Sequence, residues 1–221
     1  MAGGRKEGEF PVQGAGFLAI WSDVGLEDET DYLHWLTREH TSERLGIDGF
    51  RRVRVYRSLE TGVRRYFIHY ELRSPDVLGS EAYLARLNAP TPSSQRIMPI
   101  LGNFVRGGGR MLARAGTGEG ACLAALRLDD LLPIAGPALV ANIVTEDRIV
   151  AAELLETDQE QSSIQTREKS MREHDTSFAG LLLVEGLDEP SVAASIARLG
   201  FSISDNIYAQ IFQLFPYGAR S

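Results

Sequence analysis

The 221-residue sequence is poor in cysteine and contains no long apolar run. Its single cysteine, Cys122, excludes an intrachain disulfide and any cysteine-rich metal site. No segment approaches the roughly 18 apolar residues that cross a bilayer as a helix. Residues 1–15 are polar and glycine-rich without the apolar centre of a signal peptide, so we expect a disordered leader. These absences predict a soluble, cytoplasmic protein without a membrane partner.

The motifs of several enzyme classes are also missing. The sequence has no serine nucleophile elbow, no Walker loop, no GxGxxG after a strand and no HExxH. The glycine run at 107–109 lacks the Lys-Ser/Thr of a phosphate loop. His34 and His40 stand six positions apart on one predicted helix, a poor alignment for shared metal binding. Hydrolase, phosphoryl-transfer, dinucleotide-dependent and zinc-protease functions therefore lack a mechanism here, and we predict no metal site.

Positive charge is scarce relative to negative charge. The formal net charge is -7, which argues against a nucleic-acid partner because such surfaces concentrate Lys and Arg. The arginine-rich segment at 50–57 is the local exception, but its charged residues alternate with Val53 and Val55. That alternation is typical of a strand with one wet face. A hydrophobic content of 43% suffices for one large core or two small ones.

The hydrophobic patterns predict one order of elements twice. In the first half we expect strands at 17–21, 50–56, 65–72 and 103–115, the last interrupted by a bulge or sharp bend at the glycine run, with helices at 31–45, 81–88 and after Thr91. In the second half we expect strands at 122–128, 148–156, 178–185 and 207–215, helices at 131–142 and from Asp188, and a polar helical insert at 166–173.

Both halves read as βαββαβ, the ferredoxin-like order. Such a unit is a four-stranded sheet with both helices on one face, and its other face needs a cover. Two units satisfy each other when their bare faces pack together. We therefore predict an α+β protein of two tandem ferredoxin-like units, 16–115 and 116–221, packed sheet to sheet as an α/β barrel.

The segment at 31–50, DYLHWLTREHTSERLGIDGF, is an amphipathic helix followed by a glycine turn. On a 3.6-residue period His40 shares an apolar stripe with Leu33 and Leu36, whereas Arg44 is free to face water. An imidazole in an apolar seam is a candidate general acid or base, and we expect a carboxylate or carbonyl to hold its second nitrogen. The alternative is a core histidine that bonds to the backbone or a carboxylate.

The predicted strand at 65–72 presents two chemically different faces. Tyr66 and Tyr70 share one face, and His69 shares the other with Glu71, where it is a second catalytic candidate. Two tyrosines and two tryptophans would make an aromatic wall for a planar ligand, although aromatic residues in sheets also serve as plain core. Arg54 would hold a carboxylate or phenolate if it faces the cleft, and Asn103 and Arg106 are further candidate donors. The substrate-binding candidates are Trp21, Trp35, Tyr66, Tyr70 and Arg54.

The segments FLAIW at 17–21, YLHWLTREHTSERLGIDGFRRVRVYR at 32–57 and RYFIHYEL at 65–72 resemble the dimeric α/β-barrel superfamily, in its EthD-like and antibiotic-biosynthesis-monooxygenase-like branch. The resemblance implies ferredoxin-like units joined through their sheets, and a ligand cleft between each sheet and its helices. It places the family's helix-one histidine at His40. The second half has no histidine in its first helix, so an equivalent site there is in doubt.

The resemblance implies several activities, since the superfamily contains cofactor-independent monooxygenases, lactone isomerases, polyketide cyclases, dehydratases and haem enzymes. We expect a protein that binds a small aromatic or polyketide-like metabolite and transforms it without a cofactor, by lyase, isomerase or oxygenase chemistry. One alternative is a non-catalytic ligand-binding or accessory protein. Another is a haem-binding barrel with His40 as axial ligand. Whether the chain forms a homodimer is left open.

Overall fold

The computed structural model describes residues 14–62, 64–131, 136–172, 176–203 and 206–217. Apart from its last two residues, the predicted leader lies outside the described residues. The eight strands are β1 (Gly16–Asp23), β2 (Phe50–Ser58), β3 (Arg65–Leu72), β4 (Gly102–Ala115), β5 (Cys122–Leu128), β6 (Ile149–Thr157), β7 (Gly180–Gly186) and β8 (Ile207–Leu214). The α-helices are α1 (Glu29–Trp35), α2 (Thr41–Leu45), α3 (Glu81–Asn88), α4 (Pro92–Ile97), α5 (Gly136–Ile143), α6 (Gln159–Ser163), α7 (Arg167–Ser170) and α8 (Glu189–Arg198). None of these described helices has the length and apolar character to cross a membrane.

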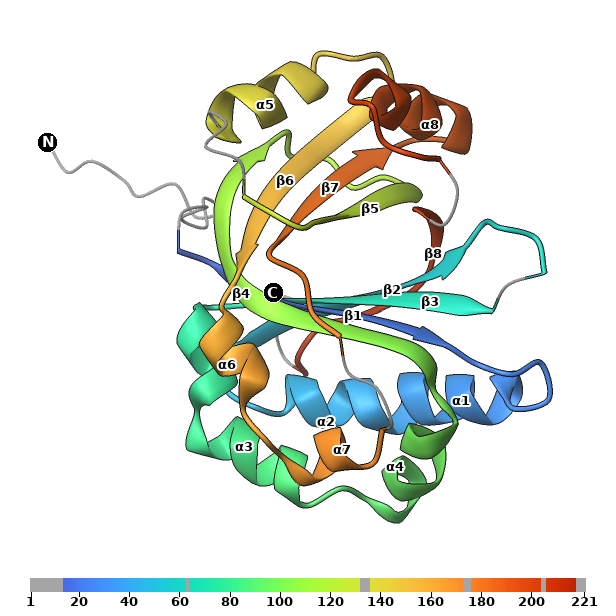
Figure 1. Ribbon diagram of the computed structural model, residues 1–221, viewed down its shortest axis with the longest axis vertical. Coiled ribbons are helices and arrows are strands. Elements are labelled where there is room, and N and C mark those ends of the chain that lie inside the picture. The colour runs from blue at the N-terminus through green and yellow to red at the C-terminus, as the bar shows by residue number, and fades with distance from the viewer. Residues whose placement is uncertain (1–13, 63, 132–135, 173–175, 204–205, 218–221) are drawn as a thin grey trace, which may run out of the picture.

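The strands close into one antiparallel barrel in the order β1-β3-β2-β8-β5-β7-β6-β4 (Figure 1). Within each half the order is the same, β4-β1-β3-β2 in the first and β8-β5-β7-β6 in the second. The halves are joined where β2 pairs with β8 and where β4 pairs with β6. The prediction of two tandem ferredoxin-like units packed as a barrel is therefore confirmed.

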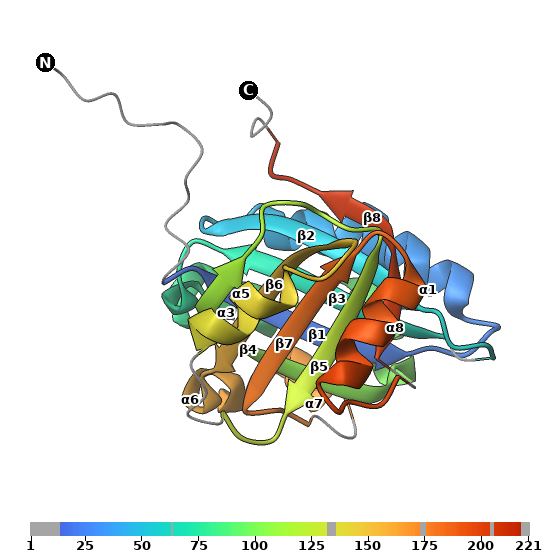
Figure 2. The ribbon, with the colours of Figure 1, turned by 90° about the horizontal axis from the view of Figure 1, so that it is seen from above.

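Helices cover the outside of the barrel in two groups. Those of the first half lie below the barrel in Figure 1, whereas α5 and α8 lie above it and cover the second sheet (Figure 2). One segment crosses from the second half to the first. The connection between β6 and β7 carries α6 and α7, and α7 packs against α3. We call residues 158–172 the insert, because they place second-half side chains on the first half's helices.

Side-chain alternation on the strands divides the core into three apolar clusters. One lies between the first sheet and its helices and contains Leu18 and Tyr70. The second fills the barrel interior, where Phe17 and Phe67 from the opposite faces of the same strands meet second-half residues. The third lies between the second sheet and its helices. The two sheets thus cover each other's bare faces, as the repeat predicted.

The glycine run was expected to interrupt its strand with a bulge or a sharp bend, and neither the interruption nor the bulge is present. Strand β4 continues through Gly107–Gly109 and keeps its register with β1. The irregularity in its pairing with β6 falls later, between Met111 and Ala113. A Cβ atom on Gly109 would lie 2.0 Å from the carbonyl oxygen of Glu156. At that position glycine is required by the close approach of the neighbouring strand.

Candidate functional site

The helix at the front of the first half is continuous but not regular. Between α1 and α2 it contains a π-helical turn, Leu36–His40, that ends on the candidate histidine. A π turn inserts one extra residue, which rotates the following helix by about 100° relative to a regular α-helix. His40 remains buried, and Arg44 turns inward until only 2% of it is exposed. The prediction that Arg44 faces water is wrong, because Arg44 lies four residues after His40 and therefore on the same buried face of the helix.

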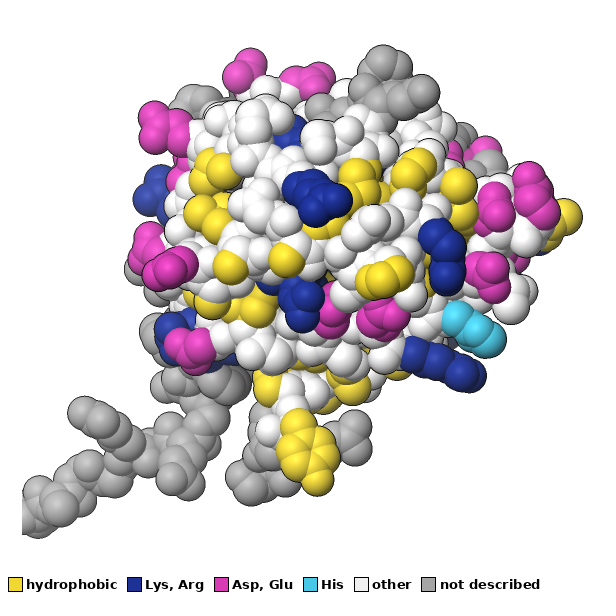
Figure 3. All heavy atoms as spheres, turned by 90° about the horizontal axis from the view of Figure 1, so that it is seen from below, with side chains coloured by type: hydrophobic (Ala, Val, Ile, Leu, Met, Phe, Trp, Pro, Cys, Tyr) yellow, Lys and Arg dark blue, Asp and Glu magenta, His cyan; other side chains and the backbone are white. Residues whose placement is uncertain are grey.

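A cavity of about 40 Å³ lies between the first sheet and its helices. Its walls come from β1, β3 and β4, from the helix that carries His40, from α3, and from the insert. By volume the space holds roughly three water molecules. Figure 3 shows the molecule from the side of the first-half helices, where hydrophobic, basic and acidic side chains are interspersed on the surface. The second half therefore supplies one wall of a first-half cavity.

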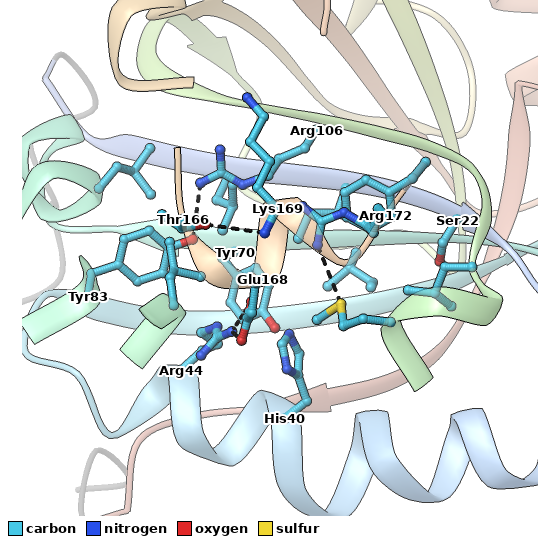
Figure 4. A pocket seen from close by; sticks show the side chains of 18 of the residues that line it. Ser22, His40, Arg44, Tyr70, Tyr83, Arg106, Thr166, Glu168, Lys169 and Arg172 are labelled. Carbon is cyan, nitrogen blue, oxygen red and sulfur yellow. Dashed lines mark hydrogen bonds and ion pairs between the residues drawn. The ribbon is translucent and has the colours of Figure 1, made fainter. Parts of the chain in front are cut away.

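His40 points into this cavity from the helix (Figure 4). It is 5% exposed, and its ring centroid lies 4.2 Å from that of Trp35, whose Nε1 donates to Ser94 Oγ at 3.0 Å. Burial lowers the pKa of His40 well below its usual value, and the positive charge of Arg44 lowers it further. The ring is therefore neutral near pH 7. Among the described residues Nδ1 has no hydrogen-bond partner, in contrast to our expectation of a carboxylate or carbonyl there.

Beside His40, a buried ion pair joins the two halves. Nη2 of Arg44 donates to both carboxylate oxygens of Glu168, at 2.6 and 2.7 Å. Glu168 lies on α7 in the insert and is 4% exposed. Nη1 of Arg44 has no partner within the described part of the chain. Figure 4 shows Arg44, Glu168 and His40 converging on one side of the cavity.

The remaining polar groups of the cavity are mostly donors. Tyr70 is fully buried, and its hydroxyl has no partner among the described residues. Arg106 donates from Nη2 to the hydroxyl of Tyr83 at 3.1 Å. Lys169 donates from Nζ to the carbonyl oxygen of Ser162 at 3.2 Å. The lining thus carries a positive charge that Glu168 only partly balances.

Arg172 is a further cation of the lining and belongs to the insert. Its guanidinium carbon lies 3.9 Å above the ring centroid of Phe104, and its Nη1 donates to Met98 Sδ at 3.4 Å. A guanidinium stacked on an aromatic face keeps its charge and presents a flat surface. The wall opposite His40 is therefore both cationic and planar.

Three of the seven candidate residues meet in this cavity, namely His40, Trp35 and Tyr70. Tyr66 lies on the same face of β3 but behind Tyr32, with their ring centroids 4.9 Å apart. The hydroxyl of Tyr66 donates to Glu29, and Tyr66 does not line the cavity. The aromatic wall is thus made by Trp35 and Tyr70 rather than by the two tyrosines together.

The other three candidates, Trp21, Arg54 and His69, point into the barrel interior. Trp21 packs on Phe67 at 4.6 Å between ring centroids, and Nη1 of Arg54 donates to Glu185 at 2.7 Å. Both nitrogens of His69 lack partners among the described residues, and burial lowers its pKa well below the usual value. Because strand side chains alternate, these residues lie across the sheet from His40 and do not share its cavity.

Sequence reasoning missed the most unusual pair of the cavity, Arg44 and Glu168. Arg44 was assigned to the surface, although it lies four residues after His40 and so shares its helix face. Glu168 was seen only as part of a polar helical insert in the other half. Arg106 was a candidate donor and does line the cavity, whereas Asn103 donates to Asp23 at the surface. Within the described residues no cluster of His, Cys, Asp and Glu has the arrangement of a metal site.

No protein-family model and no curated protein sequence matches the chain. Solved structures do match it. An anthrone oxidase-like protein superposes with a TM-score of 0.58 at 9% identity, over 93% of this chain and 94% of that one. A candidate monooxygenase from Fusobacterium nucleatum gives 0.50 at 11% identity, over 92% and 95% of the two chains. A candidate monooxygenase from Lactobacillus acidophilus gives 0.50 at 7% identity, over 92% and 97%. At such identities the likeness shows the fold alone, which is a closed eight-stranded antiparallel barrel covered by helices.

Proposed function

We propose that the protein binds a small aromatic or polyketide-like molecule in this cavity and transforms it by removing a proton with His40, without a prosthetic group. The observation that carries the proposal is a neutral imidazole, with an unpartnered nitrogen, inside a cavity walled by aromatic rings. A general base needs a free lone pair at the working pH and a bound substrate within reach. Both requirements agree with the geometry of the site.

The low pKa of His40 selects the kind of proton it removes. A weakly basic imidazole takes only a proton that is already acidic, such as a C–H or O–H conjugated to carbonyl groups. Loss of that proton leaves a negative charge spread over the ring system. The cations Arg44 and Arg172 line the same cavity and stabilise such a charge in a site of low dielectric constant. The anion in turn favours the protonated form of His40.

The deprotonated substrate leads to three reaction types. In an isomerase it takes the proton back at a different atom, in a lyase it expels a leaving group, and in an oxygenase it reacts with dioxygen. The descriptions of the solved neighbours, one anthrone oxidase-like protein and two candidate monooxygenases, favour dioxygen as the second substrate. In that version dioxygen is the oxidant: one oxygen atom becomes the carbonyl of a former CH₂ carbon, and the other leaves as water.

Oxygen consumption with anthrone as the probe tests this proposal. We expect turnover by the wild type and a loss of at least about 100-fold in His40→Gln, since a general base contributes on the order of 10²–10⁴ in rate. His34→Gln is the matched control, because His34 is exposed on the same helix, and it should keep full activity. Equal turnover by His40→Gln and the wild type would exclude His40 as the base.

A non-catalytic ligand-binding protein is the second candidate function. The observation that favours it is the small volume of the cavity, whose wall is held by a buried ion pair. Ligand binding without any chemical change of anthrone, measured by product chromatography after prolonged incubation, would support this alternative and end the enzymatic proposal.

We propose that His40 does not ligate a haem, because a porphyrin on its imidazole would have to displace the buried Arg44–Glu168 pair beside it (Figure 4). An absorbance spectrum of the purified protein checks this conclusion. An intense Soret band that disappears in His40→Ala would contradict the cofactor-free proposal.

A further inference from the structure

We infer that the ligand of this cavity carries an oxyanion on its aromatic ring, a carboxylate or an acidic phenol, and that Arg44 binds this oxyanion in exchange for Glu168. The inference deepens the proposed function, since it names the ligand class of the same cavity. It does not depend on His40 acting as a base, because it concerns binding alone.

Two buried donors of the cavity lack acceptors among the described residues. They are Nη1 of Arg44, on a side chain that is 2% exposed, and the hydroxyl of Tyr70, which is fully buried. Buried donors without partners are rare in proteins because each forfeits its hydrogen bonds to water. Both groups line the same cavity, and the charge of Arg44 acts on Tyr70. A ligand rich in acceptors satisfies both at once.

Charge points to an anionic ligand rather than a neutral one. The lining contains Arg44, Arg106 and Lys169 but a single described carboxylate, that of Glu168. The carboxylate is already bonded to Arg44, whereas Arg106 and Lys169 donate to neutral oxygens. The chain as a whole has a net charge of -7, so this cavity is locally opposite in sign to the molecule. Cationic linings of this kind attract anions most strongly where water is excluded.

Aromatic side chains define the shape of the ligand. Trp35 and Tyr70 line the cavity, and so does Phe104 with its stacked Arg172. Flat walls of this kind fit a planar ring system. In Figure 4 the guanidinium of Arg172 lies across the cavity from His40, so a ring between them contacts a cation and the imidazole together.

The size of the cavity shows why Glu168 has to leave Arg44. A cavity of about 150 Å³ is needed for a benzene-sized ligand, and this one measures about 40 Å³. The wall that comes from the other half is the insert, which the Arg44–Glu168 pair fastens to the helix of His40. Moving the insert away would leave Arg44 buried without a counter-ion. A ligand oxyanion that replaces Glu168 compensates this charge, so binding and opening occur together.

The test uses two naphthalene probes that differ in charge. Binding of 2-naphthoate and of 2-naphthalenemethanol to the full-length protein is measured by titration calorimetry at low ionic strength. We expect 2-naphthoate to bind at least 10-fold more tightly. Tyr70→Phe should weaken 2-naphthoate several-fold and leave 2-naphthalenemethanol unchanged. Glu168→Gln, which removes the competing carboxylate, should strengthen 2-naphthoate binding. Arg148→Gln, which changes an exposed arginine of the second half, is the matched control and should change neither affinity.

Equal affinities for the two probes, or no binding of 2-naphthoate, would overturn the inference. Weaker 2-naphthoate binding in Glu168→Gln would also overturn it, provided that circular dichroism shows the variant to be folded. The two proposals fail separately. A 2-naphthoate preference without His40-dependent turnover ends the proposed function and keeps the inference, and His40-dependent turnover with no preference does the opposite. With 2-naphthol as a third probe, binding that tightens as the pH rises assigns the site to phenolates, whereas pH-independent weak binding assigns it to carboxylates.

Discussion

The two halves of the barrel share one strand order but fill the same space differently. Between the first sheet and its helices lie the aromatic and charged residues of the cavity, with Tyr32, Trp35, His40 and Arg44 on a single helix. In the second half the equivalent space is filled mainly by aliphatic side chains. They include Ala124, Val140, Val184, Val192 and Ile196.

The two halves therefore repeat the fold but differ in the residues that lie between the sheet and its helices. A packed aliphatic cluster stabilises the second sheet, whereas the cavity with the unpartnered donors of Arg44 and Tyr70 lies in the first half, as far as the described residues show. The second half still takes part, because its insert supplies Glu168, Lys169 and Arg172 to the first-half cavity. One half thus serves as scaffold and cover for the other.

The largest expected effect comes from breaking the ion pair between the halves. Glu168→Ala leaves Arg44 buried without a counter-ion, and we expect the free energy of unfolding to fall by about 3 to 5 kcal/mol. Chemical denaturation measures this loss. The double variant Arg44→Met with Glu168→Met removes both charges and should recover most of it. A single variant as stable as the wild type would mean that the pair does not fasten the insert.

Packing in the second half gives the next effect. Ile196 is fully buried on α8 in the aliphatic cluster, so Ile196→Ala should lower the free energy of unfolding by about 2 to 5 kcal/mol through lost contacts and a new cavity. Ile211→Ala is the control, since Ile211 is 45% exposed. Thermal unfolding of both variants decides the matter, and equal effects would contradict the assignment of Ile196 to the core.

The pH dependence of stability tests whether His40 is buried in its neutral form. The folded-state pKa of His40 lies below its unfolded value, so its contribution to stability is full above about pH 6.5 and is lost as the pH falls. The unfolded chain binds the proton first, which costs about 1.4 kcal/mol per pH unit. The stability difference between wild type and His40→Gln should therefore shrink below pH 6.5. Denaturation curves at several pH values measure this difference in stability. A constant difference would show that the pKa of His40 is the same in the folded and the unfolded state.

The smallest expected effect is a gain. Tyr70→Phe removes a fully buried hydroxyl without a partner among the described residues and keeps the ring. We expect the free energy of unfolding to rise by up to about 1 kcal/mol, because an unsatisfied polar group is costly to bury. A functional position that lowers stability is a common feature of binding sites. A clear loss of stability in Tyr70→Phe, measured by urea denaturation, would show that the hydroxyl has a partner in the folded protein.

Local patterns predicted the elements well. The strands at 65–72 and 122–128 match β3 and β5 at both ends, because alternation and flanking turns are encoded locally. The helices expected at 81–88, after Thr91 and from Asp188 also form. Ser80, Thr91 and Asp188 cap them, because each side chain accepts a hydrogen bond from the backbone N–H three residues later.

The candidate site was predicted only in part. His40, Trp35 and Tyr70 meet in the cavity, because a helix and a strand were correctly placed against each other. Trp21 and His69 lie on the far side of the sheet, although their alternation with cavity residues was visible in the sequence. The burial of Arg44 was missed, although its spacing of four residues from His40 places both side chains on one helix face.

The sequence by itself determined the duplicated ferredoxin-like order, the apolar faces of the strands and the helix that carries His40, because these depend on periods of two and about 3.6 residues. Only the tertiary structure decided which charges enter the cavity. Arg44 and Glu168 stand 124 positions apart, and they meet because closure of the barrel brings the insert of one half over the helices of the other. A contact of that range depends on the packing of two whole units, which no local pattern records.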